Sequence, residues 1–380
     1  MSFGIPAIYY SDVYIIAITA ISIVIAIFYS FSRTNERIAS NLPVSRIAAL
    51  LLIIIIILFI GYRPLHRVFV DMGYYAYVYN HIYDGVASHY NSANRGEWLF
   101  YEFGNLCKRL GFNYSEYFLA IASIYFGLML ASCWLLMRNN MFVAIIFCVA
   151  SFSCFSYATN GMRNGMACSI AMIAICLLCG NTKWHKLVAF ALMFCAVNIH
   201  RSTALPCFCA LSALTFVKDT KNAIYFWIAS IFISLVAGEA VTQFFVNLGF
   251  DDRMESYANL DENGEVMESV NEKSGFRIDF IIYSVLPIIM AWYVTMKRNF
   301  KDKTYNILAS TYILANAFWV MVIRSNQSNR FAYLSWFLYP IVIAYPLLRM
   351  NIWDNQDRKT ALVLLAYAGF TFFMHFAYYG

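Results

Sequence analysis

The chain has 380 residues, of which 61% are apolar and only 13% charged, and its formal net charge is +6. Such a composition cannot form an ordinary soluble surface, which excludes a water-soluble enzyme or binding module. Ten cysteines could suggest disulfides, but nine fall inside apolar runs and only Cys107 lies in a polar segment. We therefore interpret the cysteines as small core residues and the chain as an all-α integral membrane protein. Nucleic-acid binding is not expected.

Apolar runs bounded by polar residues predict about twelve transmembrane helices. A hydrocarbon core of about 30 Å requires about 20 residues of helix, which sets the length of run to look for. The run 187–217 is too long for one span, and His200-Arg201 interrupts it, so we interpret it as two helices. The predicted spans are 12–31, 47–62, 116–137, 141–159, 165–180, 187–199, 202–217, 223–248, 277–296, 304–323, 331–348 and 360–378.

Basic residues in the connections predict the orientation. The segments 32–46, 138–140, 181–186, 218–222, 297–303 and 349–359 together hold 15 Lys and Arg residues against five Asp and Glu residues. The connections on the other side are net acidic. Since cytoplasmic loops carry the excess of Lys and Arg, the first set is predicted to be cytoplasmic and both termini to face out.

Two long outer loops interrupt what is otherwise predicted to be a single polytopic membrane domain, residues 1–380. Residues 63–115 are rich in tyrosine and are expected to contain short helices at the membrane face. Residues 249–276 carry eight acidic residues, spread out and not set at a ligand spacing. This acidic loop is expected to be mobile and solvated, with no metal site.

Six arginines sit at or next to the outer ends of predicted helices, where the charge rule predicts few. They are Arg63, Arg67, Arg163, Arg201, Arg324 and Arg330. A single such arginine would be a membrane anchor, and that interpretation stays open for Arg67 and Arg324. Six on one face indicate an anion, because a guanidinium stays charged and matches phosphate oxygens with two parallel N–H bonds. We expect the other four to line one outward-facing cavity and bind a diphosphate.

Three of these arginines lie in polar breaks between apolar runs, where polar groups are expensive and usually serve a function. The first break is Asn160-Gly161-Met162-Arg163-Asn164-Gly165, whose glycines let backbone N–H groups and the next helix N-terminus face a ligand. The other two breaks are His200-Arg201-Ser202 and Asn329-Arg330-Phe331-Ala332-Tyr333.

The outer loop after the second predicted span carries a possible sugar-binding face. Asp71, Tyr75 and Tyr79 recur every four residues, so a helix would place them on one face. Tyrosine rings with a polar tip suit a membrane interface, and they also suit stacking on sugar rings beside a carboxylate. Both interpretations stay open.

These residues resemble the EpsG-like branch of the Wzy polysaccharide polymerases, which is related in architecture to O-antigen ligases and the broader GT-C glycosyltransferases. The matching pieces run over most of the chain, from the second predicted span to the eleventh. In chain order they are Arg63 with Asp71 and Tyr75, Glu97 with Tyr101, Arg163 with Asn164, His200 with Arg201 and Ser202, and Arg330 with Tyr333. The acidic loop belongs to no pattern of this family.

The resemblance implies a GT-C-like architecture in the bacterial inner membrane, with the active site facing the periplasm or cell exterior. It implies a polymerase for O-antigen, capsule or exopolysaccharide biosynthesis, which transfers a growing glycan from undecaprenyl diphosphate to the non-reducing end of a lipid-linked repeat unit. The expected partners are the undecaprenyl-diphosphate-linked donor and acceptor, membrane lipids and a chain-length regulator protein. No cofactor or metal is expected, since arginines would hold the diphosphate. The expected sugar-binding residues are Tyr75, Tyr79, Tyr101, Asn164 and Tyr333.

This reaction requires a base for the acceptor hydroxyl, and His200 is our candidate, with Asp71 and Glu97 in reserve. An imidazole exchanges protons near neutral pH, and His200 would lie at the lip of the membrane. The alternative is a structural histidine at a helix break. Two other functions stay open, an O-antigen-ligase-like glycosyltransferase and a transporter or flippase of a lipid-linked anion. A transporter is expected to carry polar groups at mid-bilayer and on both faces, whereas the candidate residues here concentrate outside.

Overall fold

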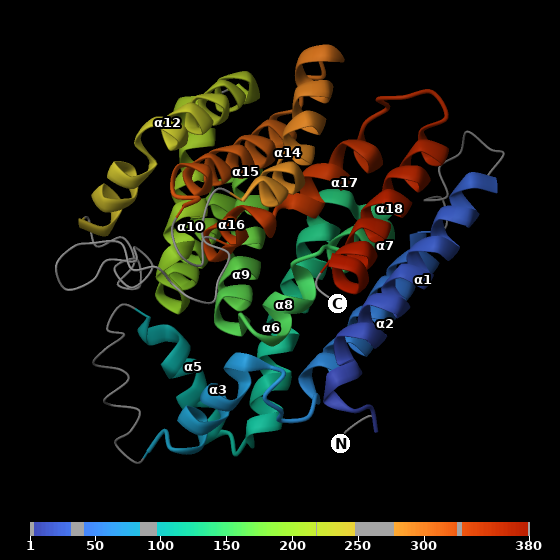
Figure 1. Ribbon diagram of the computed structural model, residues 1–380. Coiled ribbons are helices and arrows are strands. Elements are labelled where there is room, and N and C mark those ends of the chain that lie inside the picture. The colour runs from blue at the N-terminus through green and yellow to red at the C-terminus, as the bar shows by residue number, and fades with distance from the viewer. Residues whose placement is uncertain are drawn as a thin grey trace. The chain divides into compact units, whose positions relative to one another are not determined.

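The structure is a computed structural model, and it describes residues 4–31, 42–83, 97–217, 219–247, 277–324 and 329–378. Within these ranges every regular element is a helix (Figure 1), which confirms the all-α prediction. Six helices among these residues are long and apolar enough to cross a membrane, and three shorter apolar helices accompany them, so the count of about twelve spans stays a prediction. The GT-C-like architecture stays a prediction, and the acidic loop 249–276 lies outside the described residues. The chain forms two compact units, residues 1–200 with 344–380 and residues 201–343.

The first unit is organised around a helix that is covered on both sides. α9 (Met162–Leu178) packs between α6 (Tyr114–Met137) and α10 (Lys183–Ile199), while α2 (Leu42–Gly61) packs on the far side of α6. Nearly every side chain of α9 is buried as a result. α2 and α10 instead expose long apolar side chains, as a helix in contact with lipid does.

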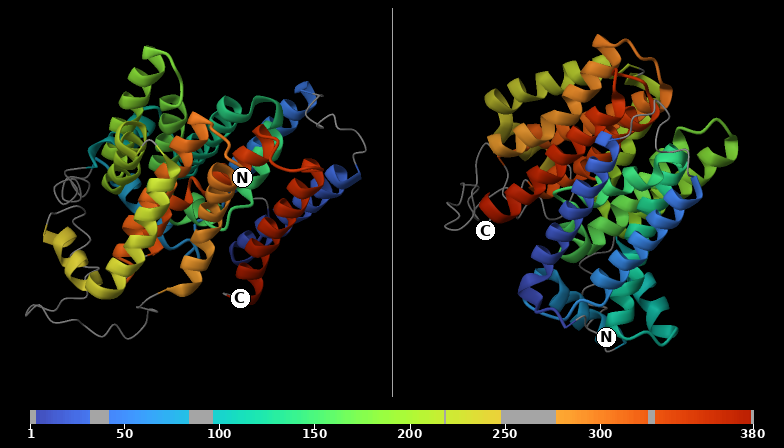
Figure 2. Two further views of the ribbon diagram at one scale, coloured as in Figure 1. Left: turned by 90° about the horizontal axis from the view of Figure 1, so that it is seen from above. Right: turned by 90° about the vertical axis from the view of Figure 1, so that its right-hand side faces the viewer.

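Two further helices of the first unit lie against each other (Figure 2), α1 (Tyr10–Phe31) and α18 (Gln356–Phe373). Near the start of α1, Tyr10 stacks on Phe59 of α2, with 4.6 Å between ring centroids. Two residues beyond the end of α18, the His375 Nε2 atom lies 2.7 Å from the Asp12 carboxylate. The start of the first helix and the end of the last one therefore meet at the end of the unit where α2 finishes, and the side of the membrane that they face stays a prediction.

The described part of the segment between α2 and α6 forms two short helices, α3 (Val70–Asn80) and α5 (Trp98–Arg109), at that same end of the unit (Figure 1). α6 then begins at a complete capping box. The Asn113 side chain accepts the Ser115 and Glu116 backbone N–H groups, and the Glu116 carboxylate accepts the Asn113 N–H at 2.8 Å. This cap fixes the first residue of α6, and so it fixes the point at which the chain enters α6 after α5.

The predicted span 141–159 is not one helix, because the chain breaks at residues 150–153 into α7 (Met141–Val149) and α8 (Cys154–Thr159). A break inside a bilayer frees backbone carbonyls, which need new donors. Here the Tyr14 hydroxyl of α1 donates to the Val149 carbonyl, and the Thr371 hydroxyl of α18 donates to the Ala150 carbonyl, both at 2.7 Å. The break is therefore stabilised from helices distant in sequence.

The second unit surrounds α15, a helix that is buried along most of its length. Its elements are α11 (Ala204–Ser212), α12 (Thr220–Asn247), α14 (Ile278–Trp292), α15 (Lys303–Met321), α16 (Asn329–Trp336) and α17 (Tyr339–Arg349) up to residue 343. The predicted span 331–348, like the span 141–159, is interrupted. A turn at residues 337–338 separates α16 from α17.

Buried polar side chains link the helices of the second unit. The Trp227 indole donates to the Asn316 side-chain oxygen at 2.8 Å, and the Asn316 amide donates to the Ser335 hydroxyl at 3.0 Å. The Trp336 indole donates to the Ser284 hydroxyl at 2.8 Å. These three buried donors thereby have partners, which lowers the cost of burying them in a low-dielectric interior.

Candidate functional site

Glu97, Arg163 and His200 come together where three helices of the first unit begin or end. Glu97 immediately precedes α5, Arg163 is the second residue of α9, and His200 directly follows α10. An Arg163 guanidinium nitrogen lies 2.7 Å from one Glu97 carboxylate oxygen. The His200 Nδ1 atom lies 3.9 Å from the other. Three of the residues singled out in the sequence therefore form one cluster.

The cluster is nearly closed to solvent. Glu97, Arg163 and His200 expose 3%, 9% and 7% of their surface. Burying a charge to this degree is costly unless the charge is paired or hydrogen-bonded, and here the carboxylate pairs with the guanidinium. The N-termini of α5 and α9 add partial positive charge beside Glu97, which favours a carboxylate or a phosphate there.

Local sequence sets the position of Arg163. The polar segment Asn160-Gly161 separates α8 from α9, and one turn into α9 a Cβ atom on Gly165 would lie 2.6 Å from the Tyr157 carbonyl oxygen. Only glycine lets the two helices approach so closely. The turn is thereby kept tight, and Arg163 is held in the first turn of α9, pointing toward Glu97.

A hydrogen bond between side chains holds Glu97 next to His200. The Trp98 indole nitrogen, in the first turn of α5, donates to the Asn198 side-chain oxygen near the end of α10 at 2.7 Å. The Asn198 amide in turn donates to the Phe194 carbonyl at 2.8 Å. Sequence reasoning missed this pair. The sequence hints at this pair only by position, since Trp98 directly follows Glu97 and Asn198 lies two residues before His200.

An aromatic surface borders the cluster. Tyr75 of α3 contacts Phe100 of α5 with 5.6 Å between ring centroids, and the Arg163 guanidinium lies 5.9 Å from the centre of the Phe100 ring. Tyr75 and Tyr101 both lie near the Arg163 guanidinium. The structure thus brings two of the predicted sugar-binding tyrosines to the cluster.

Three other predicted site residues of this unit are Tyr79, Asp71 and Asn164. Tyr79 is buried, stacks on Tyr117 with 4.3 Å between centroids, and donates its hydroxyl to the Phe112 carbonyl at 2.7 Å. Burial raises the pKa of Tyr79 to about 12, so the hydroxyl stays protonated as this bond requires. Asp71 is half-buried on the same helix as Tyr79, and the Asn164 side chain accepts the Cys168 thiol at 3.2 Å. Their sugar contacts stay predictions.

Arg63 is enclosed by protein in this structure, with 1% of its surface exposed. Its two terminal nitrogens donate to the Ile60 carbonyl at 2.7 Å and to the Thr159 carbonyl at 3.2 Å. The Phe69 and Phe118 rings flank the guanidinium, with centroids at 5.4 and 5.3 Å. Burial lowers the pKa of Arg63 to about 9, which still leaves it charged at neutral pH. Arg63 therefore ties the end of α2 to the turn that positions Arg163.

Arg201, Arg330 and Tyr333 belong to the second unit. Arg201 opens a short turn before α11, and Arg330 is the second residue of α16; both side chains are exposed. The Tyr333 ring contacts Trp336 at 5.4 Å. Their predicted place in a common cavity with Arg163 stays a prediction.

The cluster combines three chemical capacities. A guanidinium at a helix N-terminus suits a phosphate or diphosphate. A carboxylate beside an imidazole nitrogen orients the ring and stabilises its protonated form, which leaves the other ring nitrogen to exchange a proton. Aromatic rings alongside suit the faces of sugar rings.

The model of the EpsG family matches residues 46–380. This range contains every residue of the cluster and of its aromatic border. No curated protein and no solved structure matches the chain.

Proposed function

The chain belongs to the EpsG family, and on that premise we propose that it polymerises a polysaccharide in the membrane. In this proposal a growing glycan leaves undecaprenyl diphosphate and joins the non-reducing end of a lipid-linked repeat unit. The reaction takes place at the outer face of the bacterial inner membrane. Its partners are the lipid-linked donor and acceptor, with a chain-length regulator protein.

One observation carries the proposal, the buried cluster of Glu97, Arg163 and His200. Glycosyl transfer from a lipid diphosphate needs a group that stabilises the leaving diphosphate and a group that accepts the proton of the acceptor hydroxyl. Arg163 supplies the first and His200 the second. Glu97 contacts both groups, since it is paired with Arg163 and lies beside the His200 ring.

In the proposed step, Arg163 exchanges its carboxylate partner for the donor diphosphate. The diphosphate takes the place of the Glu97 carboxylate on Arg163, where bidentate N–H bonds match two phosphate oxygens. The acceptor oxygen then bonds to the anomeric carbon while the bond from that carbon to the diphosphate oxygen breaks. The electron pair leaves with the diphosphate, and the hydroxyl proton passes to His200. Glu97, released from Arg163, stabilises the imidazolium that forms.

Deleting the gene tests the function against the two alternatives. We expect the surface glycan of the deletion strain to stop at one repeat unit, because units are still made, exported and attached but no longer joined. Electrophoresis of the surface glycan and mass spectrometry of the lipid-linked pool in each leaflet measure this. A plasmid copy of the gene should restore long chains.

Two outcomes of that experiment contradict polymerisation. Full-length polymer that accumulates on the lipid carrier would indicate a ligase-like transferase. Repeat units that are confined to the cytoplasmic leaflet would indicate a flippase.

A further inference from the structure

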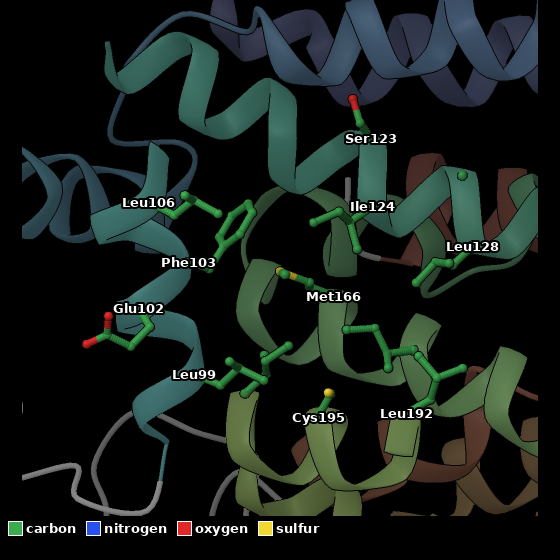
Figure 3. A pocket seen from close by; sticks show the side chains of 13 residues that line it. Leu99, Glu102, Phe103, Leu106, Ser123, Ile124, Leu128, Met166, Leu192 and Cys195 are labelled. Carbon is green, nitrogen blue, oxygen red and sulfur yellow. The ribbon is translucent and has the colours of Figure 1, made fainter. Parts of the chain in front are cut away.

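An apolar groove of about 590 Å³ opens in the first unit between α5, α6, α9 and α10. Figure 3 shows side chains from these four helices around it. α9 lies between α6 and α10, so it forms the floor while its neighbours form the walls. Residues that line the groove include Phe103, Ile124, Leu128, Met166, Leu192 and Cys195.

The groove offers a ligand almost nothing but hydrocarbon. Among the described residues that line it, Glu102 alone is charged, and it is exposed and accepts a hydrogen bond from Asn105 at 3.3 Å. The Ser123 hydroxyl donates to the Leu119 carbonyl of its own helix at 2.7 Å, so its hydrogen is not directed at the groove. Such a lining suits an apolar chain and rejects a sugar, whose hydroxyls would lose their hydrogen bonds.

The groove begins where the polar cluster ends. Leu99 lies two residues after Glu97, and Ile199 directly precedes His200. Met166 lies one helical turn after Arg163 on α9. Between Ile199 and Leu192 the groove follows α10 for seven residues, which is roughly 10 Å at 1.5 Å per residue. A ligand with an anionic head on Arg163 would therefore find a path for an attached hydrocarbon chain.

We propose that this groove binds the isoprenoid chain of the lipid-linked donor next to its diphosphate. The inference rests on the proposed polymerase function, which supplies the lipid. A chain in a bilayer already has apolar surroundings, so the groove adds packing and orientation and gains nothing from the hydrophobic effect. Its contribution is to favour binding of a donor with a full-length chain, whose diphosphate then lies at Arg163.

Filling the groove tests this inference. Gly127 of α6 lines the groove, and a Cβ atom there meets no other atom within 4 Å. Gly127→Leu therefore adds a side chain in the groove with little strain and with a better helix former. Gly369→Leu is the matched control, because Gly369 on α18 has the same open space and lies outside the groove.

We expect Gly127→Leu to raise KM about tenfold for a donor with a full-length chain, with kcat little changed, a loss of about 1.4 kcal/mol. The KM for a donor that carries only two isoprene units should not change, since a short chain does not reach the blocked part. Gly369→Leu should match wild type with both donors. If Gly127→Leu matches Gly369→Leu with the full-length donor, the inference is wrong.

Cysteine protection gives a second readout that needs no turnover. Cys195 in the groove and Cys179 outside it are the two half-exposed thiols of the ten cysteines. In detergent micelles, undecaprenyl diphosphate without sugar should slow alkylation of Cys195 by an apolar maleimide and leave Cys179 unaffected. Dioleoyl phosphatidylcholine at the same mole fraction should protect neither. Equal protection by the phospholipid would show an ordinary lipid site and overturn the inference.

These readouts separate the two claims. A wild-type enzyme that joins no repeat units from either donor contradicts the proposed function. An enzyme that polymerises, but whose Cys195 is not protected by undecaprenyl diphosphate, contradicts only the groove.

Discussion

Glu97→Gln is expected to destabilise the protein by roughly 3–5 kcal/mol and to abolish polymer formation, because it leaves the buried Arg163 guanidinium without its counter-charge. Thermal unfolding of the purified protein in detergent measures the first effect, and glycan length in complemented deletion cells measures the second. Glu102→Gln is the matched control, since Glu102 lies on the same α5 helix but is exposed. It should unfold like wild type.

The double variant Glu97→Gln with Arg163→Met separates pairing from catalysis. Removing both charges should recover much of the lost stability, because neither partner of the pair is then left as an unpaired charge. Activity should stay lost, since the diphosphate has no guanidinium. If the two single changes simply add in stability, the ion pair contributes no coupling and the cluster is not organised as described.

His200→Ala is expected to lower turnover by roughly 10²-fold or more while leaving donor binding intact, because a base acts on the proton and not on the diphosphate. The assay uses purified enzyme with a lipid-linked repeat unit and compares turnover and binding with Asp71→Asn and Glu97→Gln. His185→Ala is the control, since His185 lies exposed near the opposite end of the same helix, α10.

The outcome that reassigns the base is specific. If His200→Ala polymerises at a near-normal rate while one of the two carboxylate variants binds the donor without turnover, that carboxylate is the base. His200 would then be a structural residue at the end of α10.

Hydropathy predicted an all-helical membrane chain because it records a requirement of each short segment, namely enough apolar length to cross the bilayer. The predicted number of spans stays a prediction. The break at His200-Arg201 was also predictable, because polar residues interrupt the run there. The breaks at 150–153 and at 337–338 were not. At the first of them the freed carbonyls are satisfied by Tyr14 and Thr371, more than 100 residues away, and no local pattern reports those hydrogen bonds.

The charged residues of the candidate site could be predicted from the sequence, but the partners of these residues could not. Polar breaks identified Arg163 and His200, and the family resemblance identified Glu97. Their pairing depends on how α5 packs against α10, which Trp98 and Asn198 hold through a hydrogen bond across 100 residues. For Arg63 the sequence identified the residue but not its contacts. Its type and position indicate an anion ligand, yet its nitrogens bond to backbone carbonyls in this structure.

The central claim is that this chain alone joins lipid-linked repeat units, adding the growing glycan to each new unit. The most direct measurement supplies purified protein with undecaprenyl-diphosphate-linked repeat units, adds isotope-labelled units last, and reads the products by mass spectrometry. We predict a ladder of multiple repeat units, with the labelled unit next to the lipid and one undecaprenyl diphosphate released per bond. Glycans that stay one unit long, from protein that still binds the donor, would contradict the claim.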